Sequence, residues 1–332
     1  MSLLDQTNTT FRLEGKRVWV AGHNGLVGSA LVRRLTEEGC TVLTVSRHEV
    51  DLTRQSETER WIEYARPHVI LMAAAKVGGI GANVAYPADF LYVNTMISMN
   101  VMKAAAANAV ERLLWMGSSC IYPKHAPQPI DERALLTGPL EPTNEAYAIA
   151  KIASLKLAEA YAQQHGIPSI CIMPTNVYGQ NDNFDPELSH VIPGMIRRMH
   201  LAKTTRASNV TLWGSGTPLR EFLHADDLAD ACVFLVKNHA HLPIINIGSG
   251  QELSICELAH LVADIVGYKG SIVFNQEMPD GAPRKLLNSS RLSAMGWKPK
   301  VDLRSGIEDL YRRWQSSVQD AAERVFVELP AT

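Results

Sequence analysis

Short apolar runs alternate with stretches of helical periodicity over the first half of the chain. The apolar runs predict buried strands at 18–21, 41–45, 68–73, 112–116 and 169–173. Helical spacing between them predicts a helix that ends near Gly39 and two more at about 88–108 and 143–164. This alternation predicts an α/β protein with a Rossmann-type, doubly wound parallel sheet. Right-handed crossovers would place ligands at the carboxyl ends of the strands.

The pattern changes after Gly179 and predicts a smaller carboxyl-terminal lobe. Further elements are expected as helices at 190–199 and 254–266 and strands at 244–248 and 271–274. The strand at 244–248 is expected to rejoin the first sheet. We therefore expect a Rossmann domain at 15–180, with 221–250 returning to it, and a substrate-binding lobe at 181–220 and 251–320.

Composition narrows the classes of protein that fit this pattern. The chain has 332 residues, of which 46% are hydrophobic and 20% charged, and a formal net charge of −2. That balance argues against a dedicated nucleic-acid binder. The five cysteines form no C-x-x-C pair, so we expect reduced thiols and no metal site. No signal peptide is visible, and no window approaches about 18 uncharged apolar residues. We therefore expect a cytoplasmic protein with no membrane partner.

Three glycines mark the turn after the first predicted strand. Gly22, Gly25 and Gly28 follow a strand and open a helix, which is the context that a dinucleotide fingerprint requires. Glycines allow a tight turn and let the backbone approach a pyrophosphate, which then lies on the helix amino terminus. The alternative is a strand-to-helix turn that binds nothing.

The end of the second predicted strand favours NADP over NAD. NAD enzymes usually carry an acidic residue there for the ribose hydroxyls, whereas this chain reads Ser46-Arg47-His48. Arg47 is suited to pair with a 2′-phosphate, and Ser46 to hydrogen-bond to it. The alternative is that Arg47 is a solvated surface residue. Asp51 and Leu52 are expected near the adenine.

Tyr147 and Lys151 form a candidate catalytic pair. Residues four apart on a helix share a face. An ammonium beside a phenol can stabilise the phenolate, which would bring proton transfer by the tyrosine near neutral pH. Ser118 and Ser119 follow the fourth predicted strand, at the edge of the sheet where ligands are expected.

Together these residues resemble the proton-handling group of the short-chain dehydrogenase/reductase superfamily, in its extended nucleotide-sugar branch. Longer strings resemble the GDP-L-fucose synthase family; they lie at 117–124 (Gly-Ser-Ser-Cys-Ile-Tyr-Pro-Lys), 140–145, 173–179, 189–193, 213–222 and 279–287. The resemblance implies NADPH-dependent conversion of GDP-4-keto-6-deoxy-D-mannose to GDP-L-fucose, by epimerisation at C3 and C5 and reduction at C4. It also implies a homodimer with a four-helix interface, formed by helices near 88–108 and 145–164.

The same resemblance assigns roles to individual side chains. Tyr147 protonates the sugar oxygen as hydride arrives, while Ser118, the first of the two serines, binds that oxygen. Lys151 lowers the pKa of the tyrosine and holds the cofactor ribose. Cys120 and His190 are assigned the two proton transfers of epimerisation, and the sequence leaves their order open. A thiol near Lys151 and a cationic cofactor ring could titrate low enough to act as a base. The alternatives are a small buried cysteine and a structural histidine.

Binding residues follow from the same match. Those expected to contact the cofactor are Gly22, Asn24, Gly25, Leu26, Val27, Gly28, Arg47, Asp51, Leu52, Ala73, Ala74, Lys151, Pro174, Asn176, Val177 and His190. Those expected to bind the GDP-sugar are Arg198, Trp213, Arg220 and Lys285, with Arg284 as an alternative to Lys285. Arginine forks suit phosphate oxygens. Each of these residues could instead form an ordinary surface ion pair or packing contact.

Other activities remain open. A sister enzyme that makes GDP-L-colitose from a 3-deoxy substrate would need only the inversion at C5, and one sequence does not exclude it. A 4,6-dehydratase is disfavoured, because Cys120 and Ile121 stand where that enzyme would usually carry a carboxylate pair. A catalytically inactive NADP-binding sensor is disfavoured because Tyr147 and Lys151 are both present.

Overall fold

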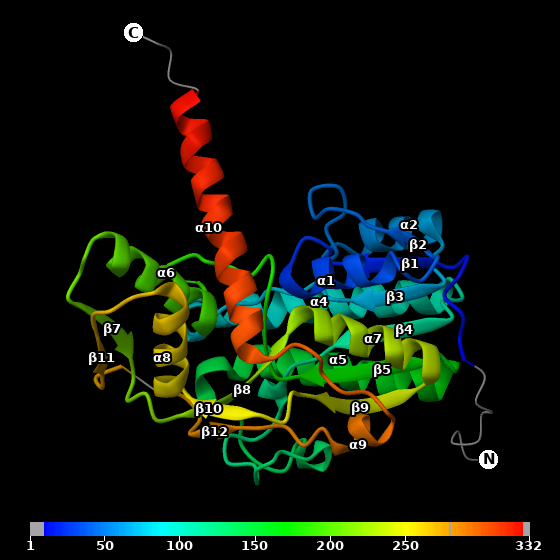
Figure 1. The fold of residues 1–332 in the computed structure, drawn as a ribbon. Coiled ribbons are helices and arrows are strands. Elements are labelled where there is room, and N and C mark those ends of the chain that lie inside the picture. The colour runs from blue at the N-terminus through cyan, green and yellow to red at the C-terminus, as the bar shows by residue number, and fades with distance from the viewer. Residues whose placement is uncertain (1–9, 187, 279, 328–332) are drawn as a thin grey trace.

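The centre of the protein is a parallel sheet of six strands, as seen in a computed structural model (Figure 1) that describes residues 10–186, 188–278 and 280–327, with side chains as far as residue 318. The strand order is β2-β1-β3-β4-β5-β9. The strands are β1 (Arg17–Ala21), β2 (Thr41–Leu43), β3 (Val69–Met72), β4 (Arg112–Met116), β5 (Ser169–Pro174) and β9 (Leu242–Ile247). The expected doubly wound parallel sheet is confirmed, as is the return of the strand near 244–248.

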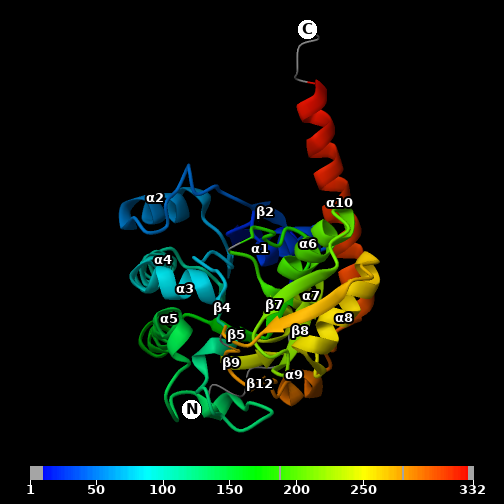
Figure 2. The same ribbon diagram turned by 90° about the vertical axis from the view of Figure 1, so that its left-hand side faces the viewer.

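Helices cover both faces of this sheet. One face packs against α1 (Leu26–Leu35) and α7 (Ala225–Asn238), and the other against α2 (Gln55–Ala65), α4 (Pro87–Ala107) and α5 (Glu145–His165). Figure 2 shows α2, α4 and α5 stacked along one side. Alternate side chains of a strand point to opposite faces, so Val18 and Val20 enter one core while Trp19 and Ala21 enter the other.

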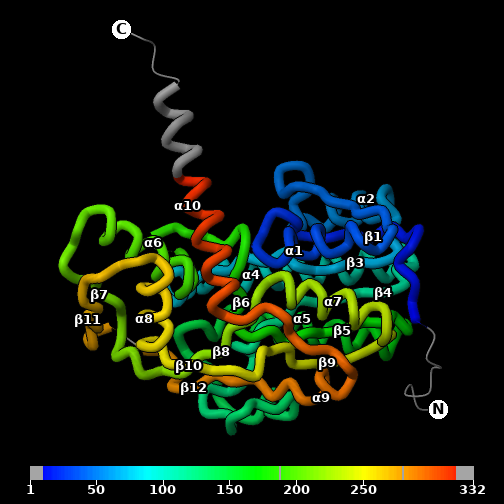
Figure 3. The backbone as a smooth tube through the Cα atoms, in the orientation of Figure 1, coloured from blue at the N-terminus to red at the C-terminus, as the bar shows by residue number. Residues whose placement is uncertain are grey.

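A smaller lobe holds a third core. It is built from α6 (Val191–Thr204), α8 (Ile255–Val266), α10 (Leu303–Val327) and a parallel strand pair, β7 (Asn209–Trp213) with β11 (Ser271–Asn275). Helix α8 begins with a capping box in which Ser254 and Glu257 exchange hydrogen bonds, as expected from its sequence. The tube in Figure 3 follows the chain from the sheet into this lobe and back through β8 and α7.

Four short strands lie between the sheet and the lobe. Strand β8 (Leu219–His224) pairs with β6 (Asn176–Tyr178), β10 (Glu252–Ser254) and β12 (Arg284–Lys285). The carboxylate of Asp227 at the start of α7 accepts the backbone N–H groups of Lys300 and Val301, at 3.0 and 2.9 Å. The pairing of β12 with β8 brings Arg220 and Lys285 side by side, although they are far apart in the chain. The remaining helices are α3 (Ile80–Ala85) and α9 (Ser290–Ala294).

Several local expectations change. Helix α5 begins at Glu145, two residues later than expected, after a 3₁₀ turn (Pro142–Asn144). Its N-cap is Asn144, whose side chain makes no cap hydrogen bond. Helices α2 and α7 and strands β7, β8, β10 and β12 were not expected from the sequence. The domain boundaries given above remain a prediction. Among the described residues, no helix is long and apolar enough to span a membrane, and no cluster of His, Cys, Asp and Glu could hold a metal ion.

Candidate active site

The turn between β1 and α1 has room only for glycine at two positions. Gly22 has φ +83°, and a Cβ there would stand 2.7 Å from the backbone N and Cα of Ala74. A Cβ on Gly28 would overlap the carbonyl group of Gly22. The first backbone N–H groups of α1, which begins at Leu26, have no carbonyl partner within the helix. The turn therefore offers an anion site with close backbone approach, as the sequence predicts.

The edge beyond β2 differs in part from expectation. The hydroxyl of Ser46 donates to Glu49 Oε2 at 2.6 Å, so it is engaged with a carboxylate that the sequence argument overlooked. Arg47 is exposed. Asp51 accepts hydrogen bonds from the backbone and hydroxyl of Thr53, and these bonds, with the charge of Arg47, lower its pKa. Arg47 is thus the group at this edge that could meet a 2′-phosphate, while Ser46 is not free to do so.

The residues expected to handle protons lie where β4 ends against α5. The backbone N–H of Cys120 donates to Ser118 Oγ at 3.3 Å. The ammonium of Lys151 donates to the carbonyl of Met116 at 2.9 Å and lies 5.6 Å from the centre of the Tyr147 ring. The structure therefore brings Lys151 of α5 to the carboxyl end of β4, where the sequence placed the two serines.

Burial reverses two expected pKa shifts. It raises the pKa of the Tyr147 phenol and of the Cys120 thiol, and it lowers the pKa of Lys151 to about 8. Lys285 and Lys151 act on Cys120 in the opposite sense but do not overcome its burial. The expected phenolate and thiolate are therefore disfavoured in the protein alone. A phenol that retains its proton is suited to donate that proton to an alkoxide, whose pKa is higher still.

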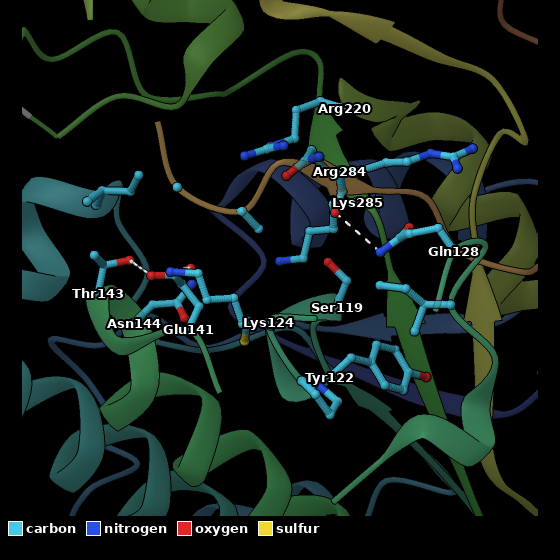
Figure 4. A pocket seen from close by; sticks show the side chains of 17 residues that line it. Ser119, Tyr122, Lys124, Gln128, Glu141, Thr143, Asn144, Arg220, Arg284 and Lys285 are labelled. Carbon is cyan, nitrogen blue, oxygen red and sulfur yellow. Dashed lines mark hydrogen bonds and ion pairs between the residues drawn. The ribbon is translucent and has the colours of Figure 1, made fainter. Parts of the chain in front are cut away.

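A cavity of about 180 Å³ opens beside Cys120 (Figure 4). It brings together four of the expected site residues: Cys120, Asn176, Arg220 and Lys285. Ser119 also lines it, whereas Ser118 does not, although the sequence favoured Ser118. The lining comes from the loop after β4, from the turn before α5 and from the short strands β6, β8 and β12.

Positive charge dominates this cavity. Lys124, Arg220 and Lys285 line it, and Glu141 is the carboxylate among its lining residues. Burial lowers the pKa of both Arg220 and Lys285. Arg284 also reaches the lining, but its guanidinium is held by Glu252 at 2.9 Å, so Lys285 is the more available cation of that pair. An anionic ligand would complement this set.

Lys124, Glu141 and Asn144 are among the lining residues that were not expected from the sequence. Lys124 forms an ion pair with Glu141 at 3.1 Å. That ion pair engages Glu141 Oε2, whereas Asn144 Oδ1 is buried and has no hydrogen-bond partner among the described residues. An unpaired buried acceptor on a residue that lines the cavity is suited to a ligand that carries donors, such as a sugar hydroxyl. The strings at 117–124 and 140–145 contained all three residues, so the signal was present in the sequence.

Tyr147 and Lys151 lie outside this cavity's lining, as do Arg198, Trp213 and His190. The guanidinium of Arg198 stands 6.0 Å from the ring of Trp213, which is 52% exposed. His190 precedes α6, and its Nδ1 lies 3.2 Å from Asp182. The carbonyl of the preceding Ser189 would stand 3.3 Å from a Cβ on Gly79, the neighbour of the cavity-lining Ile80. His190 is thus connected to the rim of the cavity through its backbone.

Comparison with known proteins identifies the family. The sequence pattern of the NAD dependent epimerase/dehydratase family matches residues 18–248. The chain belongs to this family. It is 54% identical over 310 residues to a GDP-L-fucose synthase of Sinorhizobium fredii, which covers 93% of this chain and 99% of that protein. The expected resemblance to the GDP-L-fucose synthases is therefore confirmed.

Two further proteins are similar to this chain, one in sequence and one in structure. A GDP-L-colitose synthase of Yersinia pseudotuberculosis is 39% identical over 293 residues, covering 88% of this chain and 95% of that protein. A GDP-D-glycero-L-gluco-heptose synthase of Campylobacter jejuni, solved in the presence of NADPH, has a TM-score of 0.81 and 32% identity, covering 92% and 99% of the two chains. The family member described here is thus more similar to the fucose synthase than to the colitose synthase.

Proposed function

We propose that this protein converts GDP-4-keto-6-deoxy-D-mannose to GDP-L-fucose, by epimerisation at C3 and C5 followed by NADPH-dependent reduction at C4. The observation that carries the proposal is the cavity in which Cys120 faces Lys124, Arg220 and Lys285. A nucleotide sugar has a diphosphate, which cations hold, and a hexose, which a thiol can approach. The 54% identity to a GDP-L-fucose synthase supports the choice of substrate.

The glycine turn fits a dinucleotide, because its backbone is packed so closely that side chains at Gly22 and Gly28 are excluded. In the proposed complex the amino terminus of α1 holds the pyrophosphate, Arg47 the 2′-phosphate and Lys151 the ribose. Bound NADPH supplies the hydride for C4. The assignment to NADP agrees with the absence of an acidic residue from Ser46-Arg47-His48, although Glu49 lies one residue beyond.

Reduction requires a proton at the C4 oxygen, and Tyr147 is the proposed donor. Burial keeps the phenol protonated, so it can donate when negative charge develops on that oxygen. Lys151, 5.6 Å from the ring, then stabilises the phenolate that remains. Ser118 is the proposed second hydrogen-bond donor to the same oxygen, with Ser119 as the alternative because it lines the cavity.

Epimerisation uses the same ketone. A carbonyl at C4 acidifies the hydrogens on C3 and C5, because their removal gives an enolate that the C4 oxygen shares. Inversion then needs one group on each face of the ring, and we assign these roles to Cys120 and His190. The pKa of His190 is raised by Asp182, whereas Cys120 faces two lysines. The raised pKa favours the histidine as acid, which leaves Cys120 as the base; the two lysines act against the burial that raises the pKa of its thiol.

An NADPH-oxidation assay tests this proposal. Absorbance at the nicotinamide band should fall when GDP-4-keto-6-deoxy-D-mannose is added to enzyme and NADPH. GDP-D-mannose, which lacks the ketone, is the matched control and should leave NADPH unchanged. A folded protein that binds NADPH but does not oxidise it with the keto sugar would contradict the proposal.

We also propose an oligomeric state and a cellular location for this protein. Helices α4 and α5 pack against each other and expose apolar side chains at Leu91, Tyr92, Met99 and Ile149. Covering such a surface favours association, so we propose a homodimer in which these helices form a four-helix interface. The GDP-sugar substrate and NADPH are the other proposed partners of the protein. All five cysteines are free thiols, which suits the cytoplasm.

A further inference from the structure

A carboxylate in the loop after β6 is buried beneath an imidazole. The Asp182 side chain is 2% exposed, although its neighbours Asn181 and Asn183 are exposed. Its Oδ1 lies 3.2 Å from Nδ1 of His190 and accepts the backbone N–H of Asn183 at 2.8 Å. Its Oδ2 is buried without a hydrogen-bond partner among the described residues. A carboxylate in this position is costly unless a cation lies beside it.

The imidazole can supply that positive charge. Within the described part of the chain, His190 is the one ion-pair partner of Asp182. A carboxylate only accepts hydrogen bonds, so the proton of the pair is on Nδ1. This hydrogen bond raises the pKa of His190, while burial acts in the opposite direction. The other carboxylate of the loop, Asp185, accepts the backbone N–H of Leu188 at 3.0 Å.

The backbone leaves the other ring nitrogen available. His190 has extended dihedral angles, φ −72° and ψ 171°, and immediately precedes α6. Its side chain is 42% exposed, so the ring is held at Nδ1 and is not enclosed. The adjoining Ser189 packs against Gly79, next to Ile80 of the cavity. One nitrogen is therefore fixed by a buried acceptor, and Nε2 is left for a ligand.

We propose that Asp182 is a positioning residue, which holds His190 with Nδ1 protonated so that Nε2–H faces the substrate carbon that receives a proton. This inference rests on the proposed function, in which His190 is one of two proton-transfer groups. The Nε2–H bond breaks, the enolate carbon forms a C–H bond, and the C4 carbonyl is restored. Cys120 takes the proton from the opposite face. One inversion therefore leaves the histidine neutral and the thiol protonated, and exchange with water resets both.

Solvent exchange tests the inference in the intact protein. Deuterium incorporation at C3 and C5 of the keto sugar would be followed in D₂O against pH, without NADPH, for the wild type, Asp182→Asn and Asp185→Asn. The asparagine keeps the shape of Asp182 but removes its charge, so the pKa of His190 should fall. Above both pKa values, each unit of that fall lowers the imidazolium fraction tenfold. We expect Asp182→Asn to exchange about tenfold or more slowly at pH 8, with its alkaline limb at lower pH. Asp185→Asn should follow the wild type.

The outcomes separate this inference from the proposed function. No exchange by the wild type would reject the function itself. Exchange by Asp182→Asn with the rate and pH profile of the wild type would overturn only the role of Asp182. NADPH affinity should be unchanged in Asp182→Asn, and loss of that affinity together with exchange would indicate a general structural defect and also count against the inference.

A measurement on the wild type does not depend on how the variant folds. Nitrogen-15 NMR of labelled histidine, assigned with His190→Gln, reports which ring nitrogen carries the proton. We expect His190 to keep its proton on Nδ1 when it becomes neutral, and to titrate above the ordinary value for histidine. A neutral form with the proton on Nε2, or a titration at or below the ordinary value, would refute the role of Asp182.

Discussion

Replacing single glycines in the first turn should separate folding from cofactor binding. Gly22→Ala places a side chain at φ +83°, which costs about 1–2 kcal/mol for an L-residue. Its Cβ would also stand 2.7 Å from backbone atoms of Ala74, a contact that no flexible side chain can relieve. Overpacking of this kind typically costs about 1–3 kcal/mol. The two terms together predict a loss of about 2–5 kcal/mol.

Gly25→Ala is the matched variant in the same turn. Gly25 has φ −79° and ψ 172°, which alanine adopts readily, and a Cβ there would make an ordinary contact of 3.5 Å with the Gly22 carbonyl oxygen. Its stability should therefore stay within about 1 kcal/mol of the wild type. The added methyl group would nevertheless lie where the backbone approaches the pyrophosphate. We expect NADPH to bind about tenfold or more weakly.

Thermal unfolding and NADPH titration measure the two effects. An unfolding entropy of about 2.1 cal/mol/K per residue makes 1 kcal/mol about 1.4 °C for this chain of 332 residues. Gly22→Ala should therefore lower Tm by at least about 3 °C, and it should also weaken NADPH binding. Gly25→Ala should unfold near the wild-type temperature. Gly81→Ala, where a Cβ would meet open space, is the control and should change neither quantity. Equal Tm values for Gly22→Ala and the wild type, or wild-type NADPH affinity in Gly25→Ala, would refute the reasoning.

Three other predictions concern the cavity. Lys285→Met should raise KM for the GDP-sugar about tenfold or more, since a charge-assisted contact is worth about 1.5–3 kcal/mol. Arg284→Met should raise this KM less, because Glu252 holds that guanidinium. Equal effects of the two variants in steady-state kinetics would reject this difference. Asn144→Leu should raise the same KM and leave NADPH affinity unchanged, because its unpaired Oδ1 belongs to a residue that lines the cavity; an unchanged KM would show that it binds no substrate hydroxyl. Burial lowers the pKa of Lys151 to about 8, so its positive charge is present below that pH and lost above it. The rate of reduction should therefore decline above about pH 8, and a profile that stays flat through pH 9.5 would contradict this.

The main sheet was accessible from the sequence because both of its faces are buried. Each of its strands is a short apolar run, and the turn at Gly22 needs a residue that only glycine supplies. Strands β8 and β12 were missed for the opposite reason. They contain the charged residues Arg220, Glu221, Arg284 and Lys285, and their strand form depends on pairing between distant segments, β12 with β8 and β8 also with β6 and β10. Helix α2 is rich in polar residues, so its apolar face is narrow.

The sequence predicted which residues lie close together in the site better than it predicted the directions of their pKa shifts. Tyr147 and Lys151 are one helical turn apart, and this spacing alone places them on one face. The pKa directions depend on burial, which motifs do not report; in the protein alone burial raises the pKa of Tyr147 and Cys120, and their lowering in the presence of the cofactor stays a prediction. The contact of His190 with Asp182 depends on the course of a loop that has no periodic pattern.

The most direct test of the central claim is the product formed in D₂O from GDP-4-keto-6-deoxy-D-mannose and NADPH. We expect GDP-L-fucose that carries deuterium at both C3 and C5, with one NADPH oxidised for each product. Cys120→Ala should retain NADPH binding and form little of this product. A reduced sugar with the D-configuration and no deuterium at C3 and C5 would contradict the proposed reaction, because it would show reduction without epimerisation.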